Sequence, residues 1–73
     1  MTYEEICNIL VKKKLSGQEK LDLVKDEILK NAEMINTLSP LKKFEYTNIV
    51  GLSILYAPEV FNFIQKNDLH INY

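Results

Sequence analysis

The side chains best suited to chemistry in this sequence are one cysteine, Cys7, and one histidine, His70. A cysteine nucleophile needs a nearby base, usually a histidine, to take its proton. Nothing in the sequence brings these two residues together, because Cys7 lies near the start and His70 lies in an end segment without clear periodicity. We therefore expect Cys7 to be a small buried apolar residue and His70 to be solvated.

Other arrangements on which catalysis or cofactor binding depends are missing from the sequence. The acidic pairs at 4–5 and 26–27 are adjacent in the chain, so their carboxylates do not share one helix face. Gly17 and Gly51 are the only glycines, too few for a glycine-rich phosphate loop. One cysteine and one histidine also fall short of the roughly four ligands of a structural zinc site. We therefore expect no enzyme activity, no cofactor, no metal and no small-molecule substrate.

The composition restricts the choice of partner. With 73 residues the chain forms one domain, spanning residues 1–73, and so small a domain has a narrow stability margin. A partner or a second copy, as in a homodimer, is one way to supplement it. The net charge is −1, and all nine basic residues are lysine. Without arginine the chain lacks the side chain that most often contacts guanine in DNA recognition. The absence of arginine is also explained by an AT-rich genome, as in low-GC bacteria or their phages.

The sequence also bears on where the protein resides. Glu4 and Glu5 stand where a signal peptide would need basic residues. The longest apolar stretch, 49–57, is far shorter than the roughly 20 residues that span a bilayer. A single cysteine is typical of a reducing compartment. We expect a cytoplasmic protein that does not bind membranes.

Periodicity and start signals predict an all-α fold, a compact bundle of four short helices with short connections. We expect the helices at 3–14, 17–36, 40–56 and 58–67. Thr2 and Ser16 are each followed three residues later by glutamate, which is the capping-box pattern. Ser39 precedes Pro40, and a second proline, Pro58, separates the last two helices. Proline fits the first turn of a helix and ends the helix before it.

Apolar residues at helical spacing predict which sides of three helices face the core. These are Tyr3, Ile6, Cys7 and Leu10 in the first helix, Leu21, Val24, Ile28, Ala32 and Ile35 in the second, and Val60, Phe61 and Ile64 in the fourth. The lysines at 12–14 are expected to close the first helix, where they face the negative end of its dipole.

The third predicted helix, 40–56, is apolar on two sides. Leu41, Phe44, Leu52 and Leu55 cluster on one side, and Tyr46, Val50 and Ile54 form a second line nearly opposite. A helix that is apolar all round is buried all round, so both sides could be core. The second line could instead face another protein or a second copy. Gly51 lies between the two lines, where a close helix approach would explain a residue that disfavours helix.

Protein binding is the function that this pattern favours, in a small regulator, inhibitor or adaptor, with a homodimer as one form of such binding. The candidate interface residues are the apolar ones outside the inward sides, namely Tyr46, Val50, Ile54, Leu23, Met34 and Phe63. Scattered singly, such residues are normal on a surface; gathered together, they would form a binding patch.

DNA binding in the manner of a helix-turn-helix regulator is the alternative function. Lys42 and Lys43 lie near the start of the third predicted helix, and Lys12, Lys13 and Lys14 could contact phosphates. Against this, the rest of that helix offers only Thr47, Asn48 and Ser53 for base contacts. A recognition helix needs a polar outer side, so nucleic acid is the less favoured partner.

Overall fold

Every helix begins where the sequence places its start signal. The computed structural model describes residues 1–34, 37 and 39–67. In that part of the chain the helices are α1 (Tyr3–Val11), α2 (Gly17–Glu33), α3 (Pro40–Tyr56) and α4 (Pro58–Lys66). The hydroxyls of Thr2, Ser16 and Ser39 each accept a hydrogen bond from a backbone N–H three residues later. The predicted all-α fold of four helices is confirmed.

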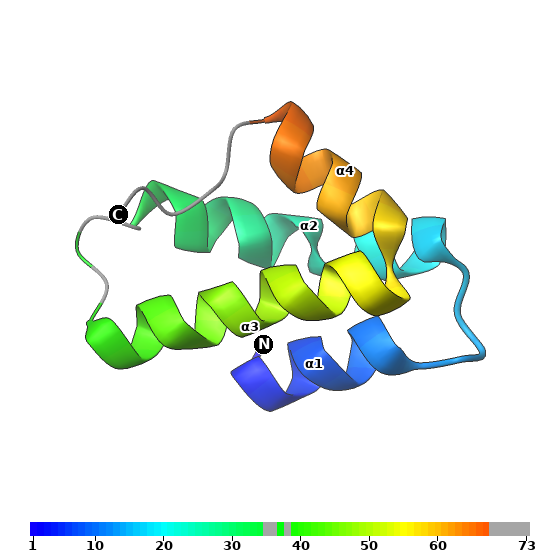
Figure 1. The fold of residues 1–73 in the computed structure, drawn as a ribbon, viewed down its shortest axis with the longest axis horizontal. Helices are drawn as coiled ribbons and strands as arrows, with labels where there is room; N and C mark the ends of the chain where they lie inside the picture. The colour runs from blue at the N-terminus through cyan, green and yellow to red at the C-terminus, as the bar shows by residue number, and fades with distance from the viewer. Residues whose placement is uncertain (35–36, 38, 68–73) are drawn as a thin grey trace.

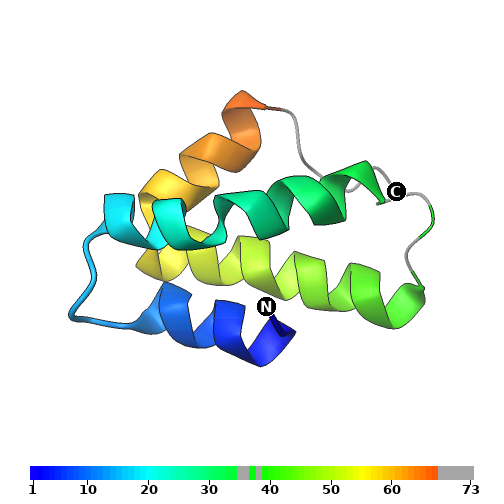
Figure 2. The same ribbon diagram turned by 180° about the vertical axis from the view of Figure 1, so that it is seen from behind.

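The helices pack as a bundle in which α2 and α3 are the two long helices, with 17 residues each (Figure 1). The adjacent α1 runs in the same direction as α3, whereas α2 runs in the opposite direction. From one side α3 lies in front of α2 (Figure 1), and from behind α2 lies in front of α3 (Figure 2). No helix of the described chain crosses the front of α3 in Figure 1. One side of α3 is therefore left uncovered by the other described helices.

The first helix is shorter than predicted, ending at Val11 rather than at residue 14. Lys12 is already extended, with ψ of 115°, and its carbonyl accepts a hydrogen bond from the Leu15 amide at 3.3 Å. The physical reason is the capping residue Ser16, which must itself be extended. Residues 12–15 are needed to make the turn, so the predicted lysine closure of α1 is wrong.

The ends of α2 and α4 also differ slightly from the prediction. Helix α2 ends at Glu33, where residue 36 was predicted, and the hydroxyl and amide of Thr37 both donate to the Met34 carbonyl at 2.8 Å. The Met34 carbonyl is therefore hydrogen-bonded within a turn and not within the helix. Helix α4 ends at Lys66, one residue early, with Asn67 as its cap. Ile35, predicted to be in the core, lies outside the described residues, as does His70.

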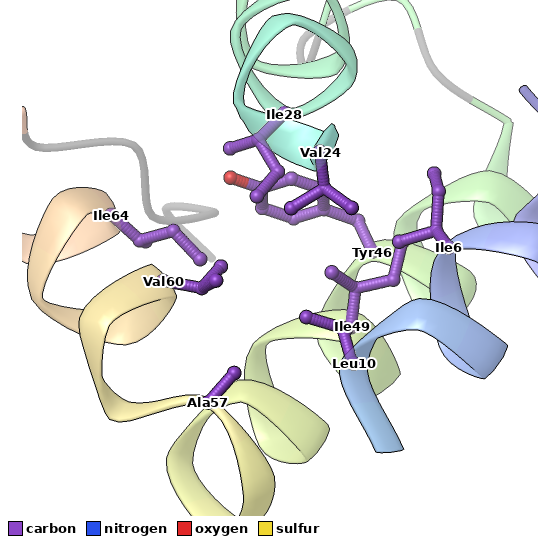
Figure 3. Packing of buried hydrophobic residues seen from close by; sticks show 9 residues of the cluster. All are labelled: Ile6, Leu10, Val24, Ile28, Tyr46, Ile49, Ala57, Val60 and Ile64. Atoms are coloured by element: carbon purple, nitrogen blue, oxygen red, sulfur yellow. The ribbon is translucent and has the colours of Figure 1, made fainter. Parts of the chain in front are cut away.

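Side chains from all four helices and the α3–α4 junction build the core (Figure 3). Its buried members are Ile6, Leu10, Val24, Ile28, Tyr46, Ile49, Ala57, Val60 and Ile64. The ring of Tyr46 points from α3 toward Val24 and Ile28 of α2 (Figure 3). The core sides predicted for α1, α2 and α4 are confirmed at their central positions, whereas the prediction for α3 is not.

The junction between α3 and α4 is held by the first turn of α2. The buried ammonium of Lys20 donates a 2.8 Å hydrogen bond to the carbonyl of Tyr56, the last residue of α3. A helix C-terminus leaves carbonyls without intrahelical partners and carries partial negative charge, which a cation stabilises. On the same side the carboxylate of Glu59 lies over Gly17, in space that a Cβ at that position would occupy. The hydrogen bond from Lys20 and the absence of a side chain at Gly17 thus allow the first turn of α2 to pack closely on the junction between α3 and α4.

Candidate docking surface

The side of α3 that faces the solvent is apolar. Leu41, Phe44 and Leu55 are 67%, 63% and 73% exposed. At 100° per residue these three residues share one side of the helix with Asn48, Gly51 and Leu52, which are partly exposed. We call this set of six residues the outer face of α3. Leu41, Phe44, Leu52 and Leu55 were predicted to form a core side. The prediction is wrong for Leu41, Phe44 and Leu55, whereas Leu52 is partly exposed and packs against the core.

The inner side of α3 is set by small residues as much as by large ones. Ser53 and Ala57 are completely buried, and they lie four residues apart on the side that meets α4. The Ser53 hydroxyl donates to the Ile49 carbonyl at 2.8 Å, so its burial leaves no unpaired donor. Leucine at either place would push α4 away, whereas serine and alanine let it come close. The polar Ser53 therefore faces inward while Leu55 faces outward.

Tyr46 was predicted as a candidate interface residue, and the structure removes it from any surface. Its side chain is 2% exposed and packs in the core. Burial raises the pKa of Tyr46 to about 12, because a phenolate is poorly solvated there. The residue contributes to folding from the inner side of α3, and a partner could reach it only if the domain opened.

A shallow, open depression lies in the outer face around Gly51. It is lined by Tyr3, Thr47, Asn48, Gly51, Leu52 and Leu55. A Cβ placed on Gly51 would meet no atom within 4 Å among the described residues. Glycine inside a helix costs about 1 kcal/mol relative to alanine. Packing within residues 1–34, 37 and 39–67 gives no reason to tolerate this cost, in contrast to Gly17.

One hydrogen bond ties the middle of the outer face to α1. The amide of Asn48 donates to the hydroxyl of Tyr3 at 3.2 Å. This bond lowers the pKa of Tyr3, but a hydrogen bond to Cys7, burial, and the charges of Cys7 and Glu45 raise it, and the net effect is a pKa above the ordinary value of a tyrosine. Asn48 is held in place as the polar centre of an apolar strip.

The remaining candidate interface residues do not come together. Ile54 is exposed on the flank of α3, whereas Val50 and Phe63 are partly buried against the core. Leu23 and Met34 are exposed on α2, which lies behind α3 in Figure 1. The candidates are thus spread over more than one side of the bundle. Sequence reasoning missed the outer face because it assigned the most exposed leucines to the core.

The lysines considered for DNA binding form two separate groups. Lys42 is exposed, and its ammonium lies 3.5 Å from Glu45, while Lys43 is only partly exposed. The exposed run at 12–14 lies in the turn between α1 and α2. Figure 1 places that turn and the start of α3 at opposite ends of the bundle. The two groups therefore do not make one basic surface.

The side chains capable of chemistry are dispersed in the described residues. Cys7 is partly buried against the core beside Tyr3. Residues 1–34, 37 and 39–67 contain no group of three or more His, Cys, Asp or Glu side chains placed to hold a metal ion. A second depression, near the N-terminus, has the carboxylates of Glu27 and Glu45 in its lining. The N-terminal ammonium of Met1 lies 3.5 Å from Glu27, so the negative charge of these two carboxylates is partly neutralised by the N-terminus.

A membrane-spanning element is not found in this part of the chain, where every helix is too short or too polar to cross a bilayer. Comparison of the chain with models of protein families, with curated proteins and with solved structures found no match.

Proposed function

We propose that this protein works without catalysis, by binding another protein chain through the outer face of α3. The observation that carries the proposal is the exposure of Leu41, Phe44 and Leu55 along one uncovered helix side. A single exposed leucine is ordinary, but three large apolar side chains in line form a surface that gains free energy when covered. The biological role would be that of a regulator, inhibitor or adaptor in the cytoplasm.

The energetic gain is appreciable for so small a domain. Complete burial of a leucine or phenylalanine side chain contributes about 1.5–3 kcal/mol. Because the three most exposed side chains keep well over half of their surface in solvent, covering all of them contributes about 3–6 kcal/mol before the costs of association. This is enough for a specific but dissociable complex.

The shape of the surface favours a helical partner. The strip from Leu41 to Leu55 is about 21 Å long at a rise of 1.5 Å per residue, or roughly four turns. The missing side chain at Gly51 lets a second backbone approach α3 closely near the middle of the strip. A groove-binding helix contributes apolar residues at i, i+3, i+4 and i+7 to such a surface. We therefore expect the partner to present an amphipathic helix.

Site-specific crosslinking tests this proposal. A photoreactive phenylalanine derivative replaces Leu55 on the outer face, and in a control protein it replaces Leu23 on α2, which is also exposed. We expect discrete crosslinked products at position 55, formed in cells that naturally make the protein, and few at position 23. The additional substitution Phe44→Lys should abolish them, because it places a charge in the apolar strip. Equal products at both positions, or products that Phe44→Lys leaves unchanged, would contradict the proposal.

A further inference from the structure

We infer that the outer face of α3 binds a second copy of this chain, with the two α3 helices antiparallel and a twofold axis passing beside Asn48. This pairing is one instance of the docking role proposed above and rests on it. In a twofold dimer each contact occurs twice, because residue i of one copy meets residue j of the other and j meets i. A surface that pairs with itself must therefore be complementary to itself, so that the residues at equal distances on either side of the axis can pack together.

The outer face has apolar residues at equal distances on either side of Asn48. Leu41 and Leu55 each lie seven residues from Asn48, and Phe44 and Leu52 each lie four residues from it. A twofold axis beside Asn48 consequently sets Leu41 against Leu55 of the other copy and Phe44 against Leu52. All four of these side chains are apolar, so every pair across the axis is complementary. The offsets of four and seven are also those that keep residues on one side of a helix.

The shape of the face matches itself in the same register. In helix packing a side chain of one helix enters a hole formed by residues i, i+3, i+4 and i+7 of the other. Asn48, Gly51, Leu52 and Leu55 have this spacing, and they line the depression in the outer face. Antiparallel pairing about Asn48 directs Phe44 of the other copy into that hole. Gly51 then has a function, because a side chain there would fill the space that the phenylalanine ring takes.

Charge selects the antiparallel direction over the parallel one. The charged residues of α3, namely Lys42, Lys43 and Glu45, all lie in its first half, and residues 46–56 carry no charge. Antiparallel pairing sets the charged half against the uncharged half of the other copy. Parallel pairing would set the charged half, with two lysines and one glutamate, at the same end as its own copy, and like net charges repel. Antiparallel helix dipoles add a further small attraction.

Asn48 fixes the register at the axis. Its side-chain amide carries two donor hydrogens and one acceptor oxygen, and the bond to Tyr3 uses one hydrogen. The second hydrogen and the oxygen can form a reciprocal pair with Asn48 of the other copy. A polar residue at the centre of an apolar helix interface disfavours shifted registers, in which it would face leucine.

The size of the face sets the expected affinity. A strip about 21 Å long on one helix is smaller than the surface of obligate dimers, which bury 2,000 Å² or more in total as a rough guide. We therefore expect a reversible dimer with a dissociation constant of about 1 µM to 1 mM. Dimers would form where the protein is concentrated and exchange with other helical partners where it is dilute.

Analytical ultracentrifugation of the full chain over a wide concentration range tests the pairing. The wild type should shift from monomer to dimer. Gly51→Gln should weaken dimerisation at least about tenfold while the fold persists, because the position is open and glutamine favours helix more than glycine does. Leu55→Gln should act in the same way, and Leu23→Gln on α2 should leave the equilibrium unchanged. Circular dichroism verifies that each variant is folded.

Disulfide formation tests the direction and the register. In a Cys7→Ala background, Leu41→Cys and Leu55→Cys proteins are oxidised separately and as a mixture. We expect the mixture to give the crosslinked 41–55 pair, and each protein alone to give little. Crosslinking of each protein to itself would indicate parallel pairing and would overturn the inference, as would a monomer at every concentration up to about 1 mM.

The photocrosslinking experiment separates this inference from the proposed function. Products at position 55 with twice the 8.5 kDa mass of the chain support self-pairing. Products of another mass only, combined with monomers in the ultracentrifuge, would leave the docking role standing and refute the second copy as its partner. Absence of both products and dimers would refute both.

Discussion

The two sides of α3 have similar apolar content but opposite environments. The inner side carries Tyr46, Ile49, Ser53 and Ala57, all of them buried, and the outer side carries leucines and Phe44, most of them exposed. Hydrophobicity alone does not decide between the two sides, because each carries one polar residue among apolar ones, Ser53 on the inner side and Asn48 on the outer side. What distinguishes the inner side is the size of its residues. Ser53 and Ala57 are small where α4 packs, and the large ring of Tyr46 fills the space next to α2 (Figure 3). Close packing, rather than the apolar character of the residues, decides which side is inside.

The comparison is most directly tested by two aromatic residues on opposite sides of the same helix. Tyr46→Ala should destabilise the fold by about 3–5 kcal/mol, because it leaves a cavity in the core. Phe44→Ala should change the free energy of unfolding by less than about 0.5 kcal/mol, since its ring is mostly in solvent. Urea unfolding monitored by circular dichroism, at concentrations where the protein is monomeric, measures both.

If Tyr46→Ala is unfolded in water, the milder Ile49→Val keeps the test quantitative, with an expected loss of about 0.5–1.5 kcal/mol. Equal effects of the substitutions on the two sides would break the distinction between them.

Two lysines, one buried at the C-terminal end of α3 and one exposed near its start, allow a second comparison between an inner and an outer position. Lys20→Met should cost about 1–3 kcal/mol, because Lys20 is only 6% exposed and the bond from its ammonium to the Tyr56 carbonyl is lost. Lys42→Met should cost at most about 0.5 kcal/mol, since an exposed pair such as that with Glu45 contributes little. Thermal unfolding of the two variants gives the comparison. A negligible effect of Lys20→Met would show that the bend between α3 and α4 is held by apolar packing alone.

Alkaline pH should affect the inner side through Tyr46. Its pKa is about 12 in the folded chain and 10.0 ordinarily. Above pH 10 the unfolded chain loses this proton while the folded chain keeps it, so the contribution to stability is complete below pH 10 and is lost as pH rises toward 12. We expect a loss of about 1–2 kcal/mol from this group.

Other tyrosines and the lysines titrate in the same range, so the relevant quantity is the difference from Tyr46→Phe. Urea unfolding of the two proteins at pH 8 to 11.5, roughly the range in which Tyr46 would change its contribution, should show a shallower decline for the variant. Parallel declines would mean that the Tyr46 hydroxyl is solvated.

Sequence reasoning succeeded for this chain where the determining interactions are local. The starts of the helices were correctly predicted because each cap binds an amide only three residues away, as Thr2 and Ser16 show. The orientation of α3 was not predicted, because it depends on how closely a second helix, α4, packs on Ser53 and Ala57, and the apolar pattern of α3 alone does not show this packing. The repeat of Ser53 and Ala57 four residues apart was a usable signal. So was Lys20, four residues before Val24 on the core side of α2, which indicated a buried acceptor.

The smallest expected effect has the opposite sign and concerns the two glycines. Gly51→Ala should stabilise the monomer by about 0.5–1 kcal/mol, because alanine favours helix and nothing in the described chain lies where its methyl group would go. Gly17→Ala should give less, because the new methyl group must displace the Glu59 carboxylate. Chemical unfolding under monomeric conditions compares the two. A loss of stability in Gly51→Ala would place a neighbour over the outer face within the chain itself, and the glycine would then need no partner to explain it.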